Sequence, residues 1–207
     1  MLIMRYLLGE RLHFNWRIVA VTVLSTLLLM VDAYHRLTPA KVYDRLILYL
    51  AIPLLTILVA FREHPGKYGF GFGDWKVGGL LTAAALVLVT PVIWLTARQT
   101  AMQQYYGSQL PGLPWTTFFD LLGWEFFFRG FILFTFTRKF GPDGLWLQAV
   151  PFALAHIGKP EVETLSTIFG GFAFGWMAYR TRSFIYPFLL HWFVATFAIL
   201  VAAGVLG

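Results

Sequence analysis

The sequence predicts an all-α protein, built as a polytopic bundle of transmembrane helices with about seven spans. Three observations predict this class: hydrophobic residues make up 58% of the 207 residues, charged residues make up only 13%, and the charges fall mostly between long apolar runs. A soluble domain is nearer a quarter charged, because its surface faces water. The composition therefore argues against a disordered chain and against a water-soluble enzyme. The chain has no Cys. It therefore has no disulfide framework, no cysteine nucleophile and no metal site with cysteine ligands.

Seven apolar segments are the expected spans. They cover residues 18–31, 46–61, 77–97, 115–137, 145–157, 164–179 and 183–207. A helix of about 20 apolar residues crosses the ~30 Å hydrocarbon layer. Backbone inside lipid must satisfy its own hydrogen bonds, so each segment is expected to be a helix rather than a strand. The first and fifth segments are short, and six spans with one re-entrant segment stay open as an alternative. We expect one integral-membrane domain over residues 1–207.

The Lys and Arg residues outside the spans predict how the chain is oriented. With seven spans, ten of them lie at the N-terminus and in the even-numbered loops, against five on the opposite side. Cytoplasmic loops carry the excess of Lys and Arg. We therefore expect a multi-pass protein of the bacterial inner (plasma) membrane with a cytoplasmic N-terminus. The net charge of +6 indicates contact with membrane lipid rather than with nucleic acid, and the amphipathic residues 1–14 are expected to lie along the interface.

Two glycine patterns have structural interpretations. Gly171 and Gly175 form a GxxxG motif in the sixth segment, which predicts close contact with another helix inside the bundle. Residues 68–73 are rich in Gly, but they follow no expected strand and lack the GK[ST] ending of a phosphate-binding loop. They predict a turn at the membrane interface.

The fourth span is unusual because it holds three charged residues, Asp120, Glu125 and Arg129. A charge at bilayer depth costs about 3 kcal/mol on insertion scales. Glu125 and Arg129 are four residues apart and lie on one helix face, so they can form an ion pair. The pair has two interpretations, a structural bridge that lets the helix pack in the bundle or part of a functional site.

Two histidines favour the functional interpretation. His156 ends the fifth span, and His191 lies inside the seventh. A lone intramembrane His commonly forms a helix–helix hydrogen bond, but two of them with a carboxylate on a third helix predict a convergent site. Such a set can activate water and stabilise an oxyanion. Alternatively, Glu125, His156 and His191 can hold zinc with one position open. Glu163 is a further candidate, although a carboxylate at a helix start is more often a cap.

The same residues resemble the motifs of a known family, the CAAX-protease and bacteriocin-processing (CPBP) family of intramembrane endopeptidases. The segment Glu125–Phe131 resembles the second Glu and the Arg of its EExxxR motif. Phe152–His156 resembles the FxxxH motif, and His191 resembles the His of the HxxxN motif. These enzymes are similar to type II CAAX prenyl endopeptidase. The resemblance implies that residues 115–207 form the catalytic core, preceded by N-terminal helices in residues 1–114.

Two positions depart from the motifs. The first Glu of EExxxR falls at Trp124, and the Asn of HxxxN falls at Ala195. Three explanations stay open: Glu125 has taken over as general base, Asp120 substitutes from one turn away, or the protein is a catalytically degenerate relative. A degenerate relative would act as an immunity or scaffold membrane protein.

The resemblance implies a glutamic-type intramembrane endopeptidase, with a metalloprotease as the alternative. Its substrate is expected to be a lipidated or membrane-anchored protein or peptide. In this hypothesis Glu125, with its charge tuned by Arg129, shares a water with His156, and the water attacks a peptide carbonyl. His191 donates a hydrogen bond to the resulting oxyanion. This mechanism needs no cofactor, and zinc belongs only to the metalloprotease alternative.

Overall fold

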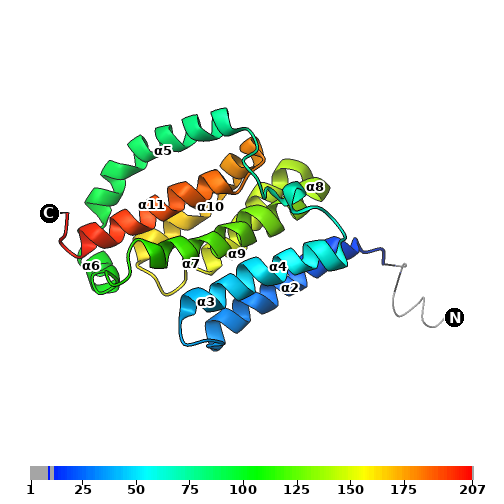
Figure 1. Cartoon of the computed structure of the whole chain (residues 1–207), viewed down its shortest axis with the longest axis horizontal. Helices are drawn as coiled ribbons and strands as arrows, with labels where there is room; N and C mark the ends of the chain where they lie inside the picture. The colour runs from blue at the N-terminus through cyan, green and yellow to red at the C-terminus, as the bar shows by residue number, and fades with distance from the viewer. Residues whose placement is uncertain (1–8, 10–11, 207) are drawn as a thin grey trace.

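The computed structural model describes residue 9 and residues 12–206 of the chain. This part of the chain is helical and contains no strand, which confirms the predicted all-α class. Figure 1 shows the long helices running back and forth along one direction. The amphipathic segment predicted for residues 1–14 lies mostly outside the described residues.

Seven helical rods make up most of the described chain, and two of them consist of several consecutive segments. In chain order the elements are α2 (Trp16–Tyr34); α3 (Lys41–Arg45), η1 (Leu46–Ala51), α4 (Ile52–Leu55) and η2 (Thr56–Ala60) as one rod; the turn η3 (Pro65–Tyr68); α5 (Trp75–Thr96); the short α6 (Thr100–Tyr106); α7 (Trp115–Glu125), η4 (Phe126–Ile132) and α8 (Leu133–Phe140) as one rod; the turn η5 (Gly141–Asp143); α9 (Gly144–Leu154); α10 (Glu161–Thr181); and α11 (Ile185–Ala202).

The seven rods occupy the places of the seven predicted segments. Among the described residues, four rods are long and apolar enough to cross a membrane: α2, the rod from α3 to η2, α5 and α11. The other three are the central rod with its charges, α9 with only 11 residues, and α10. The protein is thus a helical membrane protein, while the count of seven spans stays a prediction.

The central rod from α7 to α8 carries the core of the bundle. In Figure 1 it lies between the pair formed by α2 and α4 and the pair formed by α10 and α11. Its middle segment, η4, is π-helical and buried along its whole length. Such widened turns inside α-helices are frequent at functional sites. Glu125 is the last residue before this segment, and Arg129 lies within it.

Helices α9 and α10 pack closely through the GxxxG motif. A Cβ atom on Gly175 would lie 2.4 Å from the Nε2 atom of Gln148, and one on Gly171 would lie 3.0 Å from the ring of Phe152. Gln148 Nε2 donates to the backbone carbonyl of Gly171 at 2.7 Å. The predicted close contact inside the bundle is confirmed, with α9 as the partner helix.

The loops gather at two ends of the bundle. One end, which we call the basic end, contains residues 61–76, 138–143 and 180–184 together with the start of α2. Contacts hold it together, including Arg138 Nη1 with Glu63 Oε2 at 3.0 Å and Arg180 Nη1 with Asp74 Oδ2 at 3.3 Å. The other end contains residues 35–45, 97–114 and 155–163. Figure 1 shows the C-terminus at this second end, opposite the start of α2.

Candidate active site

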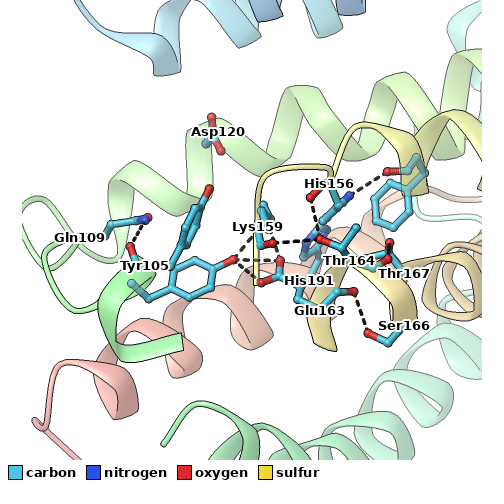
Figure 2. A network of polar contacts seen from close by, with 12 residues as sticks. Tyr105, Gln109, Asp120, His156, Lys159, Glu163, Thr164, Ser166, Thr167 and His191 are labelled. Atoms are coloured by element: carbon cyan, nitrogen blue, oxygen red, sulfur yellow. Dashed lines mark hydrogen bonds and ion pairs between the residues drawn. The ribbon is translucent and has the colours of Figure 1, made fainter. Parts of the chain in front are cut away.

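A cavity of about 430 Å³ lies where several helices meet near the second end of the bundle. Its walls come from α7, the end of α9, the start of α10, α11, the short α6 and the last turns of α5. We call this end the cavity end. The polar and charged side chains with hydrogen-bonding or ionisable groups on its walls include Arg45, Tyr105, Tyr106, Asp120, His156, Lys159, Glu163 and His191. Figure 2 shows most of this polar network from close by.

His156 is held rigidly at the closed part of the cavity. Its side chain is only 2% exposed, and its Nδ1 atom lies 2.8 Å from the backbone carbonyl of Phe152. A carbonyl only accepts, so Nδ1 carries the proton and donates. The ring also packs against Phe152 and Trp124, with ring centroids 4.5 and 5.7 Å apart. The Nε2 atom of His156 is therefore left as the nitrogen that can accept a proton.

His191 connects the cavity to the buried carboxylate. Its ring lines the cavity, and its Nδ1 atom lies 2.6 Å from Oε1 of Glu125. Glu125 itself is completely buried and is not part of the cavity wall. This short contact lets the carboxylate fix the orientation of the His191 ring. The structure thus brings Glu125 together with His191, rather than with His156.

Arg129 completes the buried charged group behind His191. Its Nε atom lies 3.3 Å from Oε2 of Glu125, and both side chains are fully buried. The guanidinium lies over the ring of Phe152, 3.8 Å from the ring centroid. Its three nitrogens have no hydrogen-bond partner among the described residues. Ion pairing and the cation–π contact therefore hold the charge of Arg129 in the core.

Trp124 and Asp120 face a different side of α7 from Glu125. Both lie on the cavity wall. Asp120 is paired with Arg45, whose guanidinium lies 4.8 Å from the ring centroid of Trp124. Arg45 Nε also lies 3.7 Å from Oδ2 of Asp32. Trp124, which stands at the position of the first Glu of the EExxxR motif, is thus packed against the guanidinium of Arg45.

Glu163 is the second carboxylate that reaches the cavity. The Tyr106 hydroxyl donates to it, at 2.7 Å from Oε2 and 2.9 Å from Oε1, and Lys159 Nζ lies 2.8 Å from Oε1. Burial and the charge of Glu163 raise the pKa of Tyr106, so this phenol stays a protonated donor. Figure 2 draws Glu163 and Lys159 together with His191, and all three residues line the cavity.

Three of these cavity residues had no sequence signal. Tyr106 is 57 residues from its partner Glu163, and Arg45 is 75 residues from Asp120. Lys159 follows His156 by three residues in a connecting loop, where a charged residue is unremarkable by itself. Sequence spacing therefore predicted the histidines and the Glu125–Arg129 pair, but not the ion pairs that line the cavity.

The zinc alternative requires Glu125, His156 and His191 to form one set of ligands. Among the residues that the structure describes, no group of three His, Asp or Glu side chains is arranged to hold a metal ion. One oxygen of Glu125 faces His191, and the other faces Arg129. His156 donates from Nδ1 to a backbone carbonyl, and zinc stays an alternative for this site.

The fold and the site together define a helical membrane protein with two histidines in a cavity and a buried glutamate–arginine pair behind them. Residues 106–197 match a family described as Rce1-like, type II CAAX prenyl endopeptidase Rce1-like. The matched part, a little less than half of the chain, contains all three motifs and confirms the resemblance that they predicted. At the level of this family the protein is similar to membrane-embedded CAAX proteases. Comparison with curated proteins gives no match, and comparison with solved structures gives none either.

Proposed function

We propose that the protein is an intramembrane endopeptidase that hydrolyses a peptide bond in a lipidated or membrane-anchored protein. The observation that carries this proposal is the single cavity lined by both His156 and His191, with Glu125 in contact with His191 behind the wall. Two imidazoles with different hydrogen-bonded partners suit different tasks, one as a proton acceptor and one as a donor.

The proposed attack uses a water held at Nε2 of His156. The water oxygen bonds to the peptide carbonyl carbon while its proton passes to an acceptor on the cavity wall, and the carbonyl π electrons move to oxygen. His156 is one acceptor, because its Nδ1 already carries a proton. The second proton acceptor is a carboxylate that lines the same cavity. We propose Glu163 for this role, since Glu125 does not line the cavity.

Glu125 and Arg129 are proposed to act through His191. The Glu125 carboxylate holds Nδ1 of His191, and with both ring nitrogens carrying a proton His191 donates its Nε2–H to the oxyanion of the tetrahedral intermediate. When the intermediate collapses, the carbonyl re-forms, the C–N bond breaks, and the departing nitrogen takes up the proton held by the wall. Arg129 pairs with the other oxygen of this carboxylate and holds it in place. Glu125 and Arg129 are therefore positioning residues.

One observation favours the second candidate function, a catalytically degenerate scaffold or immunity protein. Trp124 and Ala195 stand where the motifs have a Glu and an Asn, and both line the cavity. An Ala side chain offers no donor to an oxyanion. In that case the buried charges would serve only to hold α7, α9 and α11 together.

A cleavage assay separates the two functions. Purified protein in vesicles is tested against lipidated and membrane-anchored peptides, with His156→Gln, Glu125→Gln and, as control, His35→Gln on an exposed loop. We expect His156→Gln to lower kcat by about 10²-fold or more, and Glu125→Gln to lower kcat with little change in KM. His35→Gln should match the wild type. A wild-type protein that cleaves none of these peptides, or a fully active His156→Gln variant, would contradict the proposal.

A further inference from the structure

The two ends of the bundle differ in how much positive charge their own carboxylates neutralise. At the basic end the described residues include eight Lys or Arg against three Asp or Glu, and at the cavity end five against five. The members at the basic end are Arg17, Arg62, Lys67, Lys76, Arg138, Lys139, Arg180 and Arg182, with Glu63, Asp74 and Asp143. Those at the cavity end are Arg36, Lys41, Arg45, Arg98 and Lys159, with Asp32, Asp44, Asp120, Glu161 and Glu163.

Most of the cations at the cavity end are occupied inside the protein. Arg45 pairs with Asp120 and Lys159 pairs with Glu163. Lys41 Nζ lies 3.3 Å from Oδ1 of Asp32. These pairs hold the cations within the fold, so they are poorly placed to reach lipid phosphates. In the first loop, Lys41 and Arg45 are thus paired with carboxylates of the protein.

The basic end presents its charge to the surroundings. Arg17, Lys67 and Arg138 share one carboxylate, that of Glu63. Other exposed cations, such as Lys139 and Arg182, have no carboxylate partner within the described part of the chain. An end with excess Lys and Arg belongs on the cytoplasmic side, where the leaflet is anionic.

The cavity opens at the opposite end. Its exposed wall residues include Tyr105 in α6, Gln109 just after α6, and Val162 and Ser166 in the first turns of α10. The histidines lie further in, and His156 is buried. The wall formed by Val92, Ile93 and Thr96 belongs to α5, the helix with the smallest buried share among the four candidate spans.

We infer that the cavity opens on the extracytoplasmic side of the membrane, so that its substrate is a membrane-anchored protein whose scissile bond has been carried across the bilayer. The statement about the substrate rests on the proposed function, whereas the statement about the side rests only on charge and topology. A lipidated tail that stays in the cytosol would face the basic end, whereas the exposed residues of the cavity wall lie at the other end.

The absence of Cys makes the side directly measurable. Single variants Gln109→Cys and His35→Cys report on the cavity end, and Lys139→Cys reports on the basic end. All three positions are exposed. Intact cells are treated with a membrane-impermeant maleimide, before and after permeabilisation. We expect labelling of Gln109→Cys and His35→Cys in intact cells, and of Lys139→Cys only after permeabilisation. The reverse pattern, or labelling of all three only after permeabilisation, would overturn the inference.

The substrate is tested separately with one anchored peptide segment fused in two orientations, so that its cleavage site lies outside or inside the cell. We expect cleavage only of the outside form, and only with wild-type protein rather than His156→Gln. Cleavage of the inside form alone would overturn the inferred substrate class while leaving the endopeptidase function intact. Cleavage of neither form, with the expected labelling, would overturn the function and the substrate class but leave the side of the cavity established.

Discussion

Trp124 and Glu125 are neighbours in the sequence, yet they belong to different parts of the site. Successive residues of a helix point about 100° apart, and here Trp124 faces the cavity while Glu125 faces His191 and Arg129. A Glu at position 124 would lie on the cavity wall, whereas Glu125 lies behind it. That Glu125 shares a water with His156 stays a prediction, and the carboxylates on the wall are Asp120 and Glu163. Both carboxylates are paired, Asp120 with Arg45 and Glu163 with Lys159 and Tyr106. We prefer Glu163 as the partner for a water because the start of its helix is tied to His156, where the Thr164 hydroxyl donates to the His156 carbonyl at 2.9 Å.

The role of Glu163 predicts a specific rescue. Glu163→Gln should lower kcat by about 10²-fold or more with little change in KM. In that background Trp124→Glu should restore part of the activity, because it returns a carboxylate to the cavity wall beside His156. Cleavage rates in vesicles measure both effects, with Trp124→Gln in the same background as control.

A purely structural Glu163 would behave differently. The Tyr106 hydroxyl donates to Glu163 and links α6 to α10, so a structural role would make Tyr106→Phe and Glu163→Gln equally damaging to thermal stability and to activity. A loss of activity in Glu163→Gln that matches Tyr106→Phe, or that Trp124→Glu fails to relieve, would count against the proposed acceptor.

At the scale of the elements, hydropathy predicted where each rod lies but not how its interior is built. The seven apolar segments fall on the seven rods, because lipid and core both require long apolar helices. The π-helical segments η1, η2 and η4 have no signature in composition. The short α6 lies outside every predicted span, since its seven residues are partly polar. The cavity wall that α6 supplies could therefore not be predicted from the sequence.

The contact between α9 and α10 gives a prediction for the element scale. Gly175→Ala would push a methyl group against Gln148, which is fully buried and donates to the carbonyl oxygens of Gly171 and Leu145. Overpacking of this kind costs about 1–3 kcal/mol, so the thermal unfolding temperature in detergent should fall. Gly170→Ala on the same helix is the matched control, because nothing lies within 4 Å of its added Cβ. Equal unfolding temperatures for the two variants would contradict the close packing at Gly175.

At the scale of the whole molecule, the N-terminal helices and the family-matched segment share one core. Val21, Tyr49 and Ile57 from the first two rods belong to the same buried cluster as Phe127 and Phe152. Removing the first 60 residues would expose this apolar surface of the central rod. We therefore expect the unfolding of the described residues to be cooperative, and the single domain of residues 1–207 stays a prediction.

Glu63 ties four parts of this domain together at the basic end. The Tyr68 hydroxyl donates to it at 2.7 Å and Arg138 Nη1 lies 3.0 Å away, while Arg17 and Lys67 also approach its carboxylate. Burial raises the pKa of Glu63, but the hydrogen bonds and the neighbouring cations outweigh this effect and lower the pKa below its ordinary value of 4.5.

A lowered pKa in the folded state makes the contribution of Glu63 to stability depend on pH. The contribution is fully present above the unfolded pKa, and it is lost as the pH falls through the lower folded pKa. Glu63→Gln should therefore lower the unfolding temperature at pH 7, and its difference from the wild type should shrink as the pH falls below about 4.5. Thermal unfolding in detergent across this range measures the difference. Glu161→Gln is the control, because Glu161 is exposed and has no ion pair among the described residues. A deficit in Glu63→Gln that stays constant with pH would show that the lost contacts do not depend on the charge of Glu63.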